Sequence, residues 1–106
     1  MAEPSEPSWA SRVWRAVRRV PQGRIATYGD IAEAADCSPR MVGRALRQAP
    51  KGLRLPWHRI VAAGGRIALP GEAGLEQRLR LEAEGARFRG RRVSLEGCRW
   101  SPPTSL

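Results

Sequence analysis

Two groups of residues in this sequence have types and spacing that suit recognition chemistry. The first is the tetrapeptide Pro56-Trp57-His58-Arg59, which places an indole beside an imidazole and a guanidinium. An indole packs flat against other ring systems, but unlike a cysteine thiolate it is not a nucleophile. These properties make Trp57 a candidate for packing against a ligand. The alternative is a tryptophan of the protein core.

The second group is a row of arginines on a helix predicted from Ser38 to Ala49. Ser38 is a typical N-cap, Pro39 suits the first turn, and Pro50 ends the helix. At about 100° per residue one face is apolar, with Met41, Val42, Ala45, Leu46 and Ala49. The opposite face carries Arg40, Arg44 and Arg47 around Gly43. We expect this face to bind DNA, with an ordinary solvated basic stripe as the alternative.

Composition also indicates a polyanionic partner. The chain has 106 residues, a formal net charge of +9 at pH 7 and a sequence pI of about 11.5. This length suits one domain with a modest core, and so basic a balance is typical of proteins that bind nucleic acid. Lys51 is the only lysine, and the guanidinium fork of arginine matches phosphates and guanine edges.

The two cysteines, Cys37 and Cys98, predict neither a metal site nor a disulfide framework. Neither belongs to a C-x-x-C pair and no histidine cluster accompanies them, so we expect no metal and no cofactor. No stretch approaches the roughly 20 apolar residues of a membrane span, and residues 1–8 lack the apolar run of a signal peptide. We expect a cytoplasmic, nucleoid-associated monomer with one domain at 9–100 and flexible ends at 1–8 and 101–106.

The remaining elements are predicted from apolar spacing and turn residues. Helices are expected at 8–19, 28–35 and 72–84, a short strand at 24–26, and a hairpin of strands 60–62 and 66–68. Thr27 and Asp30 form a variant capping box before the second helix, and Gly85 ends the last one. This pattern is mostly α with a small β hairpin. It predicts a winged helix-turn-helix whose 38–49 helix meets DNA.

Beyond Gly85 the chain carries a further arginine cluster. The cluster consists of Arg87, Arg89, Arg91 and Arg92, which are interleaved with Phe88 and Val93.

Five short stretches, in order along the chain, point to one family. They are Val20-Pro21-Gln22-Gly23-Arg24, Thr27-Tyr28-Gly29-Asp30-Ile31-Ala32, Ser38-Pro39-Arg40 with Val42-Gly43, Pro56-Trp57-His58-Arg59-Ile60-Val61, and Glu84-Gly85. On these stretches the chain resembles the C-terminal DNA-binding domain of the O6-alkylguanine-DNA alkyltransferases, which have cysteine where Trp57 stands. It looks closest to the alkyltransferase-like subfamily, in which tryptophan or another residue replaces that cysteine.

The resemblance implies roles for the residues at the expected DNA surface. Tyr28 matches the tyrosine that presses on the phosphate of the target nucleotide and rotates it outward. Arg40 matches the arginine that fills the space left by the flipped base, with Arg44 as the alternative because the preceding loop is short. Gly43 matches a glycine that admits the DNA backbone, and Arg47 would contact phosphate. Thr27 and Ser38 are expected at the same DNA surface.

The resemblance also implies a pocket for the flipped base. Trp57 would form an apolar wall against the alkyl group, and His58 and Glu84 match residues that activate the missing cysteine, so here they would serve as scaffolding. The segment Pro70-Gly71 sits where relatives close over the base. Relatives also carry a hinge asparagine at the position of Ala49.

Together these observations predict a non-catalytic sensor of DNA damage. It would bind duplex DNA containing O6-alkylguanine, flip the damaged base, and flag it for nucleotide excision repair through a UvrA-type damage sensor. One alternative is a winged-helix transcription regulator. Another is an active alkyltransferase that uses Cys37 or Cys98, although neither has a histidine partner at motif spacing.

Overall fold

The computed structural model describes residues 8–102, and the ends expected to be flexible lie largely outside this range. Its first layer contains helices α1 (Trp9–Arg18), α2 (Tyr28–Ala35) and α3 (Pro39–Gln48). These helices pack on one another around a core that includes Val13, Val17, Ile31 and Val42. The predicted helices at 8–19, 28–35 and 38–49 are therefore confirmed to within about one residue at each end. The fully buried valines fall on the apolar faces that the spacing indicated.

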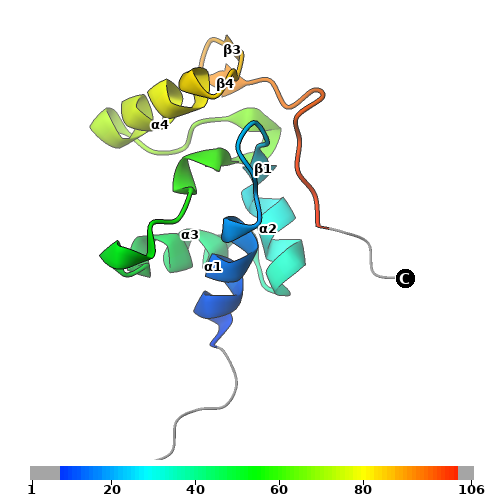
Figure 1. Cartoon of the computed structure of the whole chain (residues 1–106), viewed down its shortest axis with the longest axis vertical. Helices are drawn as coiled ribbons and strands as arrows, with labels where there is room; N and C mark the ends of the chain where they lie inside the picture. Colours follow the sequence, from blue (N-terminus) through cyan, green and yellow to red (C-terminus); the bar gives the residue numbers. More distant parts are fainter. Residues whose placement is uncertain (1–7, 103–106) are drawn as a thin grey trace, which may run out of the picture.

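The second layer is built on α4 (Gly71–Ala83) and a hairpin of β3 (Phe88–Arg89) with β4 (Arg92–Val93) (Figure 1). A smaller core joins Ile25, Val61, Leu81 and Val93 beneath it. The helix predicted at 72–84 is confirmed with a shift of one residue. Gly85 has φ +95°, a left-handed conformation that suits glycine just after a helix end.

The two layers meet at a short parallel pair of strands. β1 (Ala26–Thr27) lies beside β2 (Ile60–Val61), with Ala26 opposite Ile60 and Thr27 opposite Val61. Three turns of 3₁₀ helix fill the connections around this pair. They span Lys51–Leu53, Trp57–Arg59 and Ala63–Gly65.

The predicted hairpin of 60–62 with 66–68 is wrong. Residues 60–61 pair with β1 instead, and the antiparallel hairpin of the fold lies at 88–93. Gly64 and Gly65 do adopt positive φ, but Gly65 is placed where its backbone passes against the Val93 carbonyl. A side chain at Gly65 would collide with that carbonyl, so the Gly-Gly pair marks a close approach of two segments rather than a hairpin turn.

The C-terminal segment 94–102 runs along the side of both layers (Figure 1). The Ile25 N–H donates to the Cys98 carbonyl at 2.9 Å, and the Trp100 N–H donates to the Ile25 carbonyl at 2.8 Å. Arg99 Nη2 and Nε donate to the two carboxylate oxygens of Asp30 at 2.9 and 3.0 Å. We call this segment the C-terminal strap, because it contacts the first layer through Trp100 and the second through Leu95 and Cys98.

Gly74 allows α4 to lie against the segment that precedes it. It is buried, and a Cβ there would collide with the Leu69 carbonyl and lie 3.4 Å from Ile67 Cγ2. Alanine is the better helix former, so a local effect alone would stabilise the protein. We expect Gly74→Ala to destabilise it by about 1–3 kcal/mol because the contact is overpacked, as measured by urea unfolding. A variant as stable as the parent would contradict this packing.

Within residues 8–102 the structure has no helix long and apolar enough to cross a membrane. It also has no group of three or more His, Cys, Asp or Glu side chains that could hold a metal ion in that range.

Candidate nucleic-acid interface

Helix α3 presents its arginines to solvent because its apolar residues are used inside. Val42 and Ala45 are completely buried, whereas Arg40, Arg44 and Arg47 are exposed. The Ser38 hydroxyl accepts a hydrogen bond from the Met41 N–H at 3.3 Å, and Pro39 begins the first turn. The Trp14 Nε1–H donates to the Ala45 carbonyl at 2.7 Å and ties α3 to α1. These contacts fix the rotation of α3 and therefore the direction of its basic face.

The three arginines of α3 differ in what surrounds them. The Arg44 guanidinium carbon lies 5.9 Å from the centre of the Trp9 ring, within reach of a cation–π interaction. The Arg40 guanidinium has no salt bridge, hydrogen bond or aromatic partner within residues 8–102. Of the two residues proposed for insertion into DNA, Arg40 is thus the one whose side chain is not already packed on the protein.

A groove of about 320 Å³ lies beside the arginine face, and we call it the Trp57 groove. Its walls are mainly apolar and come from α2, α3, α4, Trp57 and the segment that follows Trp57. The lining residues are Tyr28, Gly43, Leu46, Arg47, Trp57, Ile60, Leu69 and Ala73. This volume lies at the lower end of the range of small-ligand sites, about 300–1,000 Å³. The structure therefore brings Tyr28, Trp57, Gly43 and Arg47 together, although they lie far apart in the sequence.

Tyr28 keeps its hydroxyl proton at neutral pH. Burial raises the pKa of this phenol, and the positive charges of Arg47 and Arg66 offset only part of the effect. The capping box explains how the side chain is placed. The Asp30 N–H donates to the Thr27 hydroxyl at 3.0 Å, and the Thr27 N–H donates to the Asp30 carboxylate at 3.0 Å. Tyr28 is therefore the first residue of a firmly capped helix, with a hydroxyl able to donate a hydrogen bond.

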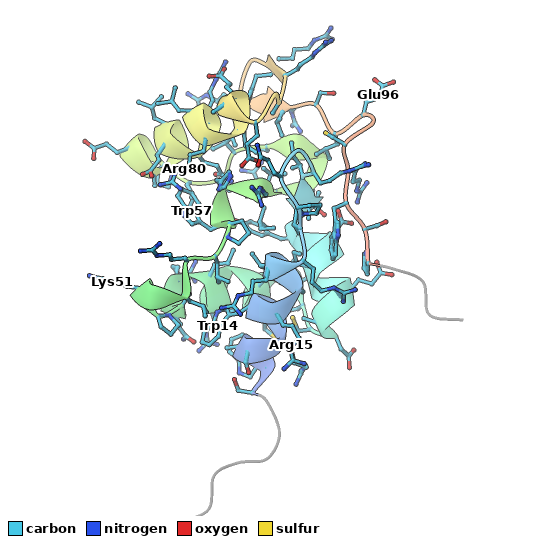
Figure 2. The ribbon with its side chains drawn as sticks, in the orientation of Figure 1. Trp14, Arg15, Lys51, Trp57, Arg80 and Glu96 are labelled. Atoms are coloured by element: carbon cyan, nitrogen blue, oxygen red, sulfur yellow. The ribbon has the colours of Figure 1, made fainter. Side chains whose placement is uncertain are left out.

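Trp57 has a cation beside its ring. It is half-buried, and the Arg80 guanidinium carbon lies 5.6 Å from the centre of its ring. Figure 2 shows Arg80 on α4 next to Trp57. The indole also meets the His58 ring edge-on, at 88° between planes. Trp57 thus lies between Arg80 of α4 and His58, and it also lines the Trp57 groove.

His58, Arg59 and Glu84 form a compact network away from that groove. His58 Nε2 lies 3.0 Å from Glu84 Oε2, and Arg59 donates to both Glu84 oxygens at 2.9 and 2.7 Å. Arg59 also donates to the Val20 carbonyl at 3.0 Å. Hydrogen bonds from Arg59, assisted by His58 and opposed by burial, lower the pKa of Glu84 to about 2. The carboxylate is therefore ionised and joins the end of α4 to the Trp57 segment, and Arg59 joins this network to Val20 just after α1.

The comparisons with known proteins fit this geometry. Residues 8–86 match the family described as "6-O-methylguanine DNA methyltransferase, DNA binding domain". The chain belongs to this family. Among relatives, the DNA base-flipping protein of Escherichia coli K12 is 40% identical over 99 residues, covering 91% of this chain and 77% of that protein. A methylated-DNA–protein-cysteine methyltransferase of Metallosphaera sedula is 44% identical over 79 residues, covering 74% of this chain and 50% of that enzyme.

Solved structures give the same assignment. The chain superposes on S. pombe Atl1, in a complex with damaged DNA containing O6-carboxymethylguanine, with a TM-score of 0.73 and 28% identity. This match covers 89% of this chain and 95% of Atl1. It also superposes on Mycobacterium tuberculosis OGT in complex with DNA, with a TM-score of 0.65 and 31% identity over 74% of this chain and 50% of that one. The helix-turn-helix fold of the alkyltransferase family is thereby confirmed, with its hairpin at 88–93 and not at the predicted 60–68.

Six residues were expected to line the pocket of this alkyltransferase-family domain, and only two of them line the Trp57 groove. Tyr28 and Trp57 line the Trp57 groove, whereas His58 and Glu84 do not. Glu84 instead borders a smaller cavity of about 190 Å³ that Cys98 also lines. Pro70 and Gly71 begin α4 and are exposed, and the groove is lined by their neighbours Leu69 and Ala73. Four residues expected in the pocket therefore do not line the groove: His58, Glu84, Pro70 and Gly71.

Two further residues expected at the DNA surface act as helix caps. Thr27 is only 5% exposed and its hydroxyl is used within the capping box, so it positions Tyr28 and offers little to a phosphate. Ser38 is exposed, but its hydroxyl likewise accepts from the helix backbone.

Neither cysteine lies in the groove. Cys37 packs against the first core, and burial raises the pKa of its thiol, which disfavours the thiolate. The Cys98 thiol donates to the Ser94 carbonyl at 3.3 Å within the C-terminal strap. The wall of the Trp57 groove therefore contains a tryptophan and no thiol.

Several residues of the site were missed by sequence reasoning. Leu69 and Ala73 belong to the groove, although they lie after the predicted hairpin. Gln77 is 2% exposed and donates to the His58 and Ile60 carbonyls at 3.2 and 2.8 Å, fixing both ends of the Trp57 turn. A glutamine at a position of α4 one turn before the buried Leu81 was the available signal for it.

Proposed function

We propose that this chain binds duplex DNA, turns an O6-alkylguanine out of the helix into the Trp57 groove, and holds it there without transferring the alkyl group. One observation carries the proposal: an indole and a donor tyrosine share one apolar groove directly beside the arginine face of α3. An unstacked base can pack against an aromatic wall, which offsets part of the few kcal/mol needed to extrude it.

The names of the relatives support binding of damage. The Escherichia coli relative is named for base flipping, and the Atl1 structure holds DNA with an O6-alkylated guanine. Other relatives are cysteine methyltransferases, so the family alone does not decide between sensing and repair. Trp57 stands between Pro56 and His58, at the position that matches the acceptor cysteine of those enzymes. This residue favours a sensor of damage over a repair enzyme.

The deciding experiment compares one duplex containing O6-methylguanine with the same duplex containing guanine, in gel-shift titrations at fixed salt. The bound DNA is then recovered and the lesion is tested for its methyl group. We expect selective binding with the methyl group retained. Removal of the methyl group would instead show a catalyst, and equal binding of both duplexes would favour a sequence-reading transcription regulator.

Arg40 and Arg47 should have separable effects. If Arg40 fills the space left by the flipped base, Arg40→Ala lowers the affinity for the lesion duplex more than that for the plain duplex. If Arg47 contacts a phosphate, Arg47→Ala weakens both duplexes equally and lowers the slope of log K against log salt by about 0.9. Parallel losses for both variants would contradict the role of Arg40.

A sensor that performs no repair needs a downstream system. We propose that the bound complex is recognised by nucleotide excision repair, through a UvrA-type damage sensor, in the cytoplasm where the nucleoid lies. The protein would act as a monomer, since one domain supplies every wall of the groove. A pull-down tests this recognition. Lesion-containing DNA is used to capture the purified excision-repair sensor, with and without this protein.

A further inference from the structure

A second basic groove lies at the edge of the β3–β4 hairpin, and we call it the arginine groove. It measures about 510 Å³. Its lining combines four arginines with a short apolar floor, and consists of Arg66, Ile67, Ala68, Leu69, Pro70, Arg89, Arg91 and Arg92. Three of the four arginines follow residue 86, where the match to the family ends. The groove therefore combines the family domain with a segment outside it.

The positive charge of this groove is not neutralised within the described chain. Within residues 8–102 the guanidiniums of Arg66, Arg89, Arg91 and Arg92 form no salt bridge and no hydrogen bond. The nearby Arg78 differs, because it pairs with Glu82 and donates to the Gly90 carbonyl at 3.0 Å. Arg78 holds the hairpin against α4, whereas the other four are free to meet an anion. Four unpaired cations lining one concave surface favour a polyanion over a single small ligand.

The arginine groove adjoins the Trp57 groove. Leu69 lines both of them. Arg66 is also close enough to Tyr28 for its charge to act on the phenol, as the charge of Arg47 does. A line of positive charge thus runs from α3 past Tyr28 to the hairpin. A ligand that is repeatedly charged along its length would follow this line, and duplex DNA, with a phosphate about every 3.4 Å along each strand, has that property.

We propose that the arginine groove is a second DNA-binding surface, which grips backbone phosphates beside the nucleotide that Trp57 receives. This inference rests on the proposed function, because it places the same duplex on both grooves. Its chemistry is electrostatic, so it adds affinity for any sequence and leaves the choice of lesion to the Trp57 groove.

The test replaces two exposed arginines of the hairpin and compares them with two exposed arginines elsewhere. Arg89→Gln with Arg91→Gln removes two charges from the groove, and Arg15→Gln with Arg18→Gln removes two charges from α1. Arg15 lies at the opposite end of the molecule from the hairpin (Figures 1 and 2). Affinities for the lesion and guanine duplexes are measured over a range of salt concentrations, after thermal unfolding has shown that both variants are folded.

We expect the hairpin variant to lose affinity for both duplexes in parallel and to lower the salt slope by about 1.8, that is about 0.9 for each lost phosphate contact. The α1 variant should keep the slope of the parent. Arg89→Lys with Arg91→Lys should keep most of the slope, since the charges remain. Shortening the duplex on one side of the lesion should weaken the parent protein and leave the hairpin variant nearly unaffected.

A hairpin variant with the affinity and slope of the parent would overturn the inference, and an acidic protein surface would then fit the groove better. An equal loss in the α1 variant would overturn it too, because net charge alone would explain both. Failure of the proposed function gives a different result. The parent would then bind lesion and guanine duplexes equally, while the contrast between the hairpin and α1 variants would still report on the arginine groove.

Discussion

Replacing Trp57 with alanine should abolish most of the preference for a duplex containing O6-alkylguanine over one containing guanine. The indole is half-buried, forms part of the groove wall, and is held in place by Arg80 and His58. Stacking of a base on an aromatic side chain contributes about 1–3 kcal/mol. Selectivity should accordingly fall by roughly 10-fold or more, because the flipped base would lose that surface while the plain duplex would lose nothing.

Matched variants make this result specific. Trp57→Phe keeps an aromatic wall of smaller area and should retain part of the selectivity. The affinity of Trp57→Ala for the plain duplex should equal that of the parent protein, because Arg40 and Arg47 are unchanged. If Trp57→Ala kept full selectivity in gel-shift titrations, the groove would not be the site of the flipped base.

The second large effect concerns folding rather than binding. Glu84→Ala should destabilise the protein by about 3–5 kcal/mol, because it leaves Arg59 and His58 without the acceptor that both now use. Glu82 offers a control, since it pairs with Arg78 on the same helix but is 43% exposed. Glu82→Ala should cost less than about 1 kcal/mol. Urea unfolding at pH 7 compares the two, and similar losses would show that the network contributes little.

The same carboxylate should make stability depend on pH in a defined direction. Its pKa is about 2 in the folded protein and 4.5 ordinarily, so the ionised form favours folding. The stabilisation is complete above pH 4.5 and is lost as the pH falls toward 2, with a total of roughly 3 kcal/mol. Glu84→Gln keeps the shape without the ionisation. Its stability should therefore be lower at pH 7 and should fall less between pH 5 and pH 3 than that of the parent.

The helices of this fold are predictable from the sequence because their signals are local. Ser38 and Pro39 begin α3, and Thr27 with Asp30 begins α2, each through contacts within one turn. The apolar spacing of α3 then indicates which side carries the arginines. For the same reason the strands were misplaced. β1 and β2 are two residues each and are joined by a long crossover, so no local pattern of alternation records their pairing.

The same distinction applies to the candidate site: residues marked by short motifs could be predicted, and residues placed by tertiary packing could not. Trp57 and Tyr28 could be selected from short motifs, and both line the groove. The position of Glu84 could not be deduced, because whether a carboxylate faces a groove or a neighbouring arginine depends on how α4 is docked. Leu69 and Ala73 carry no chemical signal at all. They are brought close together where α4 packs, at Gly74, against the Leu69 carbonyl.

The C-terminal strap has a consequence for the shape of the groove. Tyr28, Gly43 and Leu46 belong to the first layer, and Ala73 belongs to the second, so the groove exists only while the layers remain docked. The strap crosses that boundary, with Arg99 held on Asp30 across 69 residues of sequence. Because the strap packs on both layers and bonds to Ile25 and Asp30, it helps to keep the opposing walls of the groove at a fixed distance. The width of the groove is thus determined partly by a segment that contributes no residue to its lining and that lies beyond residue 86, where the family match ends.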